Sequence, residues 1–91
     1  PSGRPWIVSV SGCDRTGIVF HVTQLLAKLS GNIRQLSSRR MEPSGVSMYS
    51  MNIEVEIPDN VTSEQLLQSL TELAMREELQ IHAEPLEEFN L

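Results

Sequence analysis

The 91-residue chain has a single cysteine, Cys13, so no disulfide can form within it. Aromatic residues make up only 4 % of the chain, which argues against the base-stacking sheet of an RNA-recognition module. No apolar run approaches the ~20 residues that a membrane-spanning helix requires, and no basic segment followed by an apolar one marks a signal peptide. We therefore expect a cytoplasmic protein with no membrane partner.

Positive charge is also scarce. Seven Lys and Arg residues stand against twelve Asp and Glu, for a net charge of −5 and a pI near 4.9. A nucleic-acid binder normally carries a basic footprint, because phosphate contacts dominate its affinity. Here the only adjacent basic pair is Arg39-Arg40, so we expect no direct binding to nucleic acid. A hydrophobic content of 40 % and a length of 91 residues are typical of one small globular domain.

The first half of the chain predicts a strand, a helix and a second strand. Residues 6–11 are β-branched and partly alternating, which favours a strand. Apolar residues then recur at helical spacing and predict a helix over 16–30, with Gly31 as its left-handed C-terminal residue. That stripe consists of Ile18, Val19, Val22, Leu25, Leu26 and Leu29. The polar stretch 32–41 suits an edge strand.

The second half repeats this order. After a turn at 42–45, residues 46–57 alternate with period two, which predicts a strand with one buried face. Thr62 and Gln65 match a capping box that opens a helix running to about Leu79. A short strand over 80–84 precedes Pro85, which limits further pairing. The order β-α-β-β-α-β predicts an α+β fold: a ferredoxin-like βαββαβ sandwich, with a four-stranded antiparallel sheet and two helices on one face.

These elements place a single domain at residues 5–86, followed by an acidic C-terminal tail at 87–91. Because the chain begins without an initiator Met, we expect it to be a segment of a longer protein.

The loop that opens the first helix is the main candidate binding site. The run Gly12–Gly17 presents unpaired backbone N–H groups at the positive end of a helix dipole, where small anions such as carboxylates bind well. Gly17 would let a carboxylate approach the backbone, and Arg15 could add a charge-assisted bond. Asp14 can either cap the helix or touch the ligand. Gly17 can equally serve close packing, and Gly31-Asn32 can be only a helix stop.

Catalytic and metal sites find little support. A metallochaperone of this topology needs two thiolates in the first loop, and this loop has one cysteine. His21 and His82 lack zinc-ligand spacing with Cys13. Arg15 and Asn32 supply the residue types of an acylphosphatase, but the surrounding loop differs from that family. We therefore expect no enzyme, no cofactor and no metal.

The run Val10–Val19, with Gly31-Asn32-Ile33 after the helix, resembles the opening pattern of ACT domains. In that family a strand leads into Asp-Arg-Pro-Gly-Ile and a helix that closes on Gly-x-Asn-Ile; Thr16 stands here where the proline is usual. The turn at 40–45 and the strand around Tyr49 resemble the ACT domains of glycine cleavage system regulatory proteins, which act as transcriptional repressors and carry two such domains in tandem.

This resemblance implies a regulatory domain that binds an amino acid at an interface between two ACT domains. One side of the site would be the loop residues Asp14, Arg15, Thr16, Gly17 and Ile18. The facing side, contributed by a neighbouring domain, would be Asn32 and Ile33, with the Asn32 oxygen accepting from an ammonium group. Two alternatives stay open. The domain could be a ligand-free dimerisation module that pairs through its edge strand and first helix. It could also regulate an attached enzyme, such as a phosphoserine phosphatase or a formyltetrahydrofolate deformylase.

Overall fold

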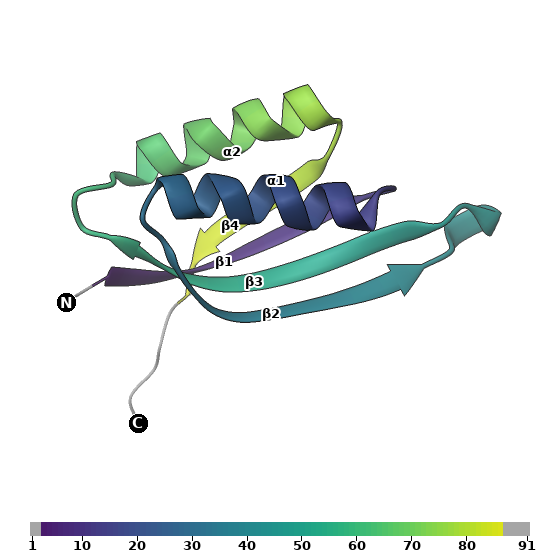
Figure 1. Cartoon of the computed structure of the whole chain (residues 1–91), viewed down its shortest axis with the longest axis horizontal. Coiled ribbons are helices and arrows are strands. Elements are labelled where there is room, and N and C mark those ends of the chain that lie inside the picture. Colours follow the sequence, from purple (N-terminus) through teal and green to yellow (C-terminus); the bar gives the residue numbers. More distant parts are fainter. Residues whose placement is uncertain (1–2, 87–91) are drawn as a thin grey trace.

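A four-stranded antiparallel sheet carries two helices on one of its faces (Figure 1). The computed structural model describes residues 3–86. Its elements are β1 (Gly3–Gly12), α1 (Arg15–Lys28), β2 (Asn32–Met41), the 3-10 helix η1 (Pro43–Gly45), β3 (Met48–Pro58), α2 (Ser63–Glu77) and β4 (Gln80–Pro85). The strand order is β2-β3-β1-β4. The predicted ferredoxin-like βαββαβ sandwich is confirmed, and the predicted tail at 87–91 lies outside the described residues.

The core lies between the helices and the inner face of the sheet. The period-two pattern of β3 puts alternate residues on this face, and the apolar stripes of both helices pack against them. The buried side chains are Trp6, Val8, Val10, Ile18, Val22, Leu26, Met51, Ile53, Val55, Ile57, Leu66, Leu70 and Leu73. Full burial of such a side chain contributes about 1.5–3 kcal/mol, so this layer holds the two helices on the sheet.

The end of α1 differs from the prediction. The helix stops at Lys28, and Ser30, not Gly31, has the left-handed backbone conformation, with φ of 61°. The Gly31 amide donates to the Leu26 carbonyl at 2.8 Å. A Cβ at Gly31 would lie 3.0 Å from Val55 Cγ2 and 3.1 Å from the Leu26 oxygen. The glycine therefore lets the chain pass close to β3, and its predicted left-handed conformation was wrong.

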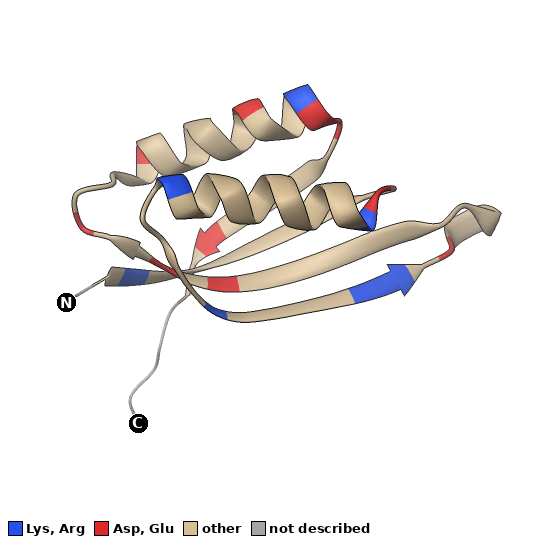
Figure 2. Cartoon of the chain, viewed as in Figure 1, with Lys and Arg blue, Asp and Glu red and all other residues tan. Residues whose placement is uncertain are grey.

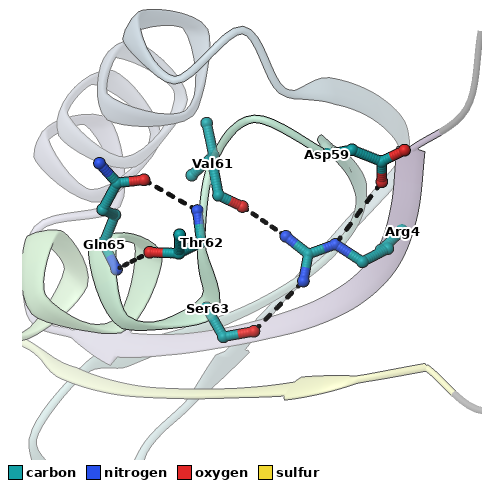
Figure 3. A network of polar contacts seen from close by, with 6 residues as sticks. All are labelled: Arg4, Asp59, Val61, Thr62, Ser63 and Gln65. Atoms are coloured by element: carbon teal, nitrogen blue, oxygen red, sulfur yellow. Dashed lines mark hydrogen bonds and ion pairs between the residues drawn. The ribbon is translucent and has the colours of Figure 1, made fainter.

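The start of α2 confirms the predicted capping box. The backbone amide of Gln65 donates to Thr62 Oγ1 at 3.0 Å, and the backbone amide of Thr62 donates to the side-chain oxygen Gln65 Oε1 at 2.8 Å (Figure 3). These two bonds satisfy amides that have no partner inside the helix. The helix then ends at Glu77, two residues before the predicted end, because Glu78 adopts φ of 56° and turns the chain towards β4.

Arg4 ties the beginning of β1 to the loop that precedes α2 (Figure 3). Its guanidinium donates to the Val61 carbonyl and to Ser63 Oγ, the latter at 3.3 Å, and its Nε lies 3.9 Å from Asp59 Oδ1. This contact joins residues nearly sixty positions apart in the chain and fixes the end of the sheet that lies far from the α1 loop.

The edge strand β2 is the least covered part of the fold. Nine of its ten residues are exposed, and only one of its edges pairs, with β3. The register slips between Ile33 and Gln35, which marks a β-bulge at Arg34. The β2–β3 hairpin also extends beyond the beginning of α1 (Figure 1). An exposed strand of this length offers a row of free backbone N–H and C=O groups to another chain.

Candidate ligand site at the start of α1

Asp14 caps helix α1. Its Oδ1 accepts a hydrogen bond from the Gly17 amide at 3.1 Å, and its backbone carbonyl accepts from the Ile18 amide at 2.9 Å. Asp14 itself has extended backbone angles, as an N-cap residue requires. Of the two roles left open for this carboxylate, the structure therefore shows capping.

Gly17 makes room for that cap. A Cβ at this position would lie 2.7 Å from Asp14 Oδ2 and 3.1 Å from its Cγ, closer than side-chain carbons normally approach. The backbone of Gly17 does not have a positive φ, so its conformation alone does not require glycine. The Asp14–Gly17 pair therefore forms a local unit in which one residue supports the other.

The remaining loop residues differ in what they offer a ligand. Arg15 and Thr16 are exposed, and their amides are the first two of the helix, which have no carbonyl partner one turn before them. No ion pair joins Arg15 to any residue between 3 and 86. Ile18, by contrast, is only 2 % exposed and packs in the core, while its amide is already bonded to Asp14. A ligand at this loop would therefore meet Arg15 and Thr16 before the other predicted residues.

Asn32 and Ile33 lie at the other end of α1. The helix has fourteen residues, which at 1.5 Å per residue separate its two ends by about 21 Å. Asn32 is exposed and donates through Nδ2 to Glu56 Oε1 at 3.1 Å, which leaves its carbonyl oxygen free to accept. Ile33 is 36 % exposed. A single domain thus does not bring the two halves of the predicted site together.

A cavity of about 380 Å³ lies where the start of α1 meets the end of α2. Cys13, Asp14, His21, Glu77 and Glu78 contribute its polar lining. His21 Nε2 lies 3.2 Å from Glu77 Oε1, a contact that links the two helices. Sequence reasoning did not identify this cavity, because its lining comes from two helices whose relative position depends on how they pack on the sheet.

The chemistry of this cavity is acidic. The carboxylates of Asp14, Glu77 and Glu78 border it. Its lining therefore suits a positively charged ammonium group better than a negatively charged ligand group. Among residues 3–86 no group of three or more His, Cys, Asp or Glu side chains has the arrangement of a metal site. In the same range no helix is long and apolar enough to cross a membrane.

Comparison with known proteins rests on solved structures alone. No family model matches the chain, and no curated protein matches its sequence. An ACT domain protein from Streptococcus pneumoniae superposes with a TM-score of 0.76 at 20 % identity, over 92 % of this chain and 91 % of that protein. A candidate glycine cleavage system transcriptional repressor gives 0.82 at 16 % identity, over 97 % of this chain and 49 % of the other. A formyltetrahydrofolate deformylase from Pseudomonas putida superposes with a TM-score of 0.74 at 19 % identity, over 88 % of this chain and 28 % of the deformylase.

The chain spans about half the length of the repressor and a smaller share of the deformylase. It matches the S. pneumoniae protein over nearly the full length of both. The shared strand order, the two helices on one face and the loop that opens α1 agree with the resemblance noted in the sequence. The chain therefore has the fold of an ACT domain.

Proposed function

We propose that this chain is a non-enzymatic regulatory domain that binds a small-molecule amino acid at an interface with a second ACT domain. One observation carries the proposal. The exposed loop residues and Asn32 lie at opposite ends of α1, about 21 Å apart. A ligand the size of an amino acid can touch both kinds of residue only if the second kind comes from another domain.

The sheet register supports the pairing that this requires. Gly12, which precedes the loop, pairs with Tyr49, and Tyr49 pairs with Arg40 near the end of β2. The loop therefore lies at the same end of the sheet as the last residues of β2, whereas Asn32 lies at the opposite end. An antiparallel strand added to β2 would bring its own first residues, equivalent to Asn32, towards the loop.

The ligand groups follow from the residues. A carboxylate would accept from the amides of Arg15 and Thr16 and from the Arg15 guanidinium. An ammonium group would donate to the carbonyl oxygen of an asparagine equivalent to Asn32. By binding across both domains, the ligand favours their paired state, and its effect is limited by its differential affinity for the two states, typically ~1–3 kcal/mol.

The apolar surface beside β2 fits the same arrangement. Ile33 and Leu36, both on β2, are exposed by 36 % and 40 %. A second domain on this edge would cover apolar side chains as well as backbone groups.

The test is thermal unfolding against a panel of amino acids, with oligomeric state measured by sedimentation. A ligand at one hundred times its Kd adds ~2.7 kcal/mol, which for a domain of this size raises the midpoint by roughly ten degrees or more. One amino acid that does so supports a sensor. A flat panel on a stable dimer would instead favour the ligand-free dimerisation module. A flat panel on a monomer, followed by binding in the full-length protein, would place the second domain elsewhere in that protein.

Two finer points belong to this proposal. The resemblance to glycine cleavage system regulators and the similarity to a candidate repressor of that system favour a cytoplasmic regulator of glycine cleavage. The similarity to one part of a formyltetrahydrofolate deformylase keeps the enzyme-attached alternative in place. The complete gene distinguishes these two alternatives, because a catalytic domain encoded in the same reading frame would support the enzyme-attached one.

A further inference from the structure

The edge strand β2 concentrates positive charge in an otherwise acidic protein. Three of the seven basic residues, Arg34, Arg39 and Arg40, fall within its ten residues, and the strand has no Asp or Glu. Figure 2 shows this charge near the beginning of β2 and again at its end. The whole chain has a net charge of −5, so this strand has the opposite sign to the molecule that carries it.

Neighbouring carboxylates offset only part of that charge. Arg34 Nε lies 3.5 Å from Glu54 Oε2, and Arg40 pairs with Glu42 at the hairpin turn. Arg39 contacts Met41 Sδ at 3.7 Å and has no carboxylate partner between residues 3 and 86. The Arg34 and Arg40 side chains keep exposed fractions of 41 % and 58 %, so their guanidinium groups still have donors directed to solvent.

This charge pattern opposes pairing between two copies of the chain. When the ten residues of β2 oppose the ten of a second copy in antiparallel fashion, Arg34 of each copy falls opposite Arg39 of the other. Like charges directly opposite on paired strands are destabilising. The two paired β2 strands would place six guanidinium groups along one interface, and neither strand contains a carboxylate.

A strand with carboxylates at the same positions would turn this repulsion into attraction. We infer that the partner of β2 is an acidic edge strand of a second, non-identical domain, and not another copy of this chain. The inference rests on the proposed pairing along β2 and names its partner. Ile33 and Leu36 would supply apolar contact, while the arginines would select the partner and its register.

The other edge of the same sheet is a poor substitute for that partner. β4 has six residues and a single carboxylate, Glu84, and it ends in Pro85, which has no N–H to donate. Pairing of β2 with β4 of another copy would also be head-to-tail, and such contacts grow into open chains unless the rotation closes them. This arrangement would reveal itself as species larger than a dimer.

The test uses a charge-reversed copy as the acidic partner. We would make Arg34→Glu/Arg39→Glu/Arg40→Glu, together with a matched neutral variant in which glutamine replaces the same three residues. Sedimentation velocity would follow wild type, each variant and equimolar mixtures. We expect wild type and the reversed variant to be monomers alone and to form a heterodimer when mixed. That dimer should weaken about tenfold or more between low and high salt, because exposed charges are screened. The neutral variant should bind wild type more weakly than the reversed variant does.

Each other outcome is decisive. A wild-type homodimer that Leu36→Arg dissociates would support the pairing along β2 but overturn the acidic partner. No association in any mixture of folded variants would overturn the pairing itself, and with it the geometry of the proposed function. Wild-type species larger than a dimer would indicate that β2 pairs with β4 of another copy, and would overturn the acidic partner. If the triple variant fails to fold, Arg39→Glu replaces it, because Arg39 has no carboxylate partner to lose among the described residues. Its mixture with wild type must then associate more strongly than either protein alone.

Discussion

The coupling between Asp14 and Gly17 makes a quantitative prediction about helix α1. The Asp14 carboxylate caps the helix through the Gly17 amide, at 3.1 Å. Loss of an N-cap side chain costs about 1 kcal/mol. For a domain of this size, 1 kcal/mol corresponds to a fall of roughly 4–8 °C in the unfolding midpoint. We therefore expect Asp14→Ala to lower the midpoint by about this amount.

Gly17→Ala should behave differently in two backgrounds. In the wild type the new Cβ would lie 2.7 Å from Asp14 Oδ2, so the carboxylate has to shift, and we expect this shift to break its capping bond. The lost cap then offsets the helix preference of alanine over glycine, which is worth up to about 1 kcal/mol, and the net change is near zero. When Asp14 is already replaced by alanine, no carboxylate is in the way, and Gly17→Ala should stabilise the protein.

The assay is a double-mutant cycle from chemical denaturation of wild type, both single variants and the double variant. We expect a coupling free energy of about 1 kcal/mol, because removal of the Asp14 carboxylate should cost almost nothing once residue 17 is alanine. Asp14→Ala combined with Gln24→Ala, an exposed position further along the same helix, serves as the additive control. If Asp14→Ala destabilises the protein equally whether residue 17 is glycine or alanine, the steric reasoning is refuted.

Three further predictions concern single positions. Thr62→Ala should remove one bond of the capping box and lower stability by about 1 kcal/mol, measured by urea denaturation, whereas Thr71→Ala on the exposed face of α2 should change stability little. Gly31→Ala should destabilise the protein by about 1–3 kcal/mol, since its Cβ would lie 3.1 Å from the Leu26 carbonyl oxygen and 3.0 Å from Cγ2 of the fully buried Val55; a thermal midpoint at or above that of wild type would contradict this packing role. Arg15→Gln should weaken binding of the amino acid found in the panel by about tenfold or more, because a hydrogen bond to a charged group is worth ~1.5–3 kcal/mol. Its melting temperature without ligand should stay at the wild-type value, and isothermal titration showing unchanged affinity would remove Arg15 from the site.

Much of the fold could be predicted because its signals are local. The alternation along β3 and the helical stripes that contain Val22 and Leu70 repeat with the period of their own element, so they require no knowledge of distant contacts. The capping box at Thr62 and Gln65 spans four residues and formed as predicted. The predicted strand over 32–41 matches β2 to the residue, because polar composition suited an uncovered edge.

The candidate site was less accessible to this reasoning. The loop residues were identified by type, but their environments separate them: Ile18 enters the core, Gly17 accommodates the cap, and Arg15 remains exposed. The acidic cavity beside the loop involves Glu77 and Glu78, more than fifty residues further along the chain. No pattern near either segment indicates that the two ends meet, since the meeting depends on how α1 and α2 lie on the same sheet.

The amino-acid sequence alone determines the order of the elements and the buried face of each, because backbone preference and hydrophobic period act over a few residues. It also identifies the loop before α1 as a candidate site, because the residues of that loop are adjacent in the chain. The tertiary structure shows that Ser30, and not Gly31, has the left-handed conformation, and that Gly31 lies close to Val55 on β3. Packing sets the two halves of the predicted site at opposite ends of α1 and leaves the basic strand β2 uncovered at the edge. These features depend on which surfaces stay exposed once the helices have packed on the sheet, and only the complete fold decides that.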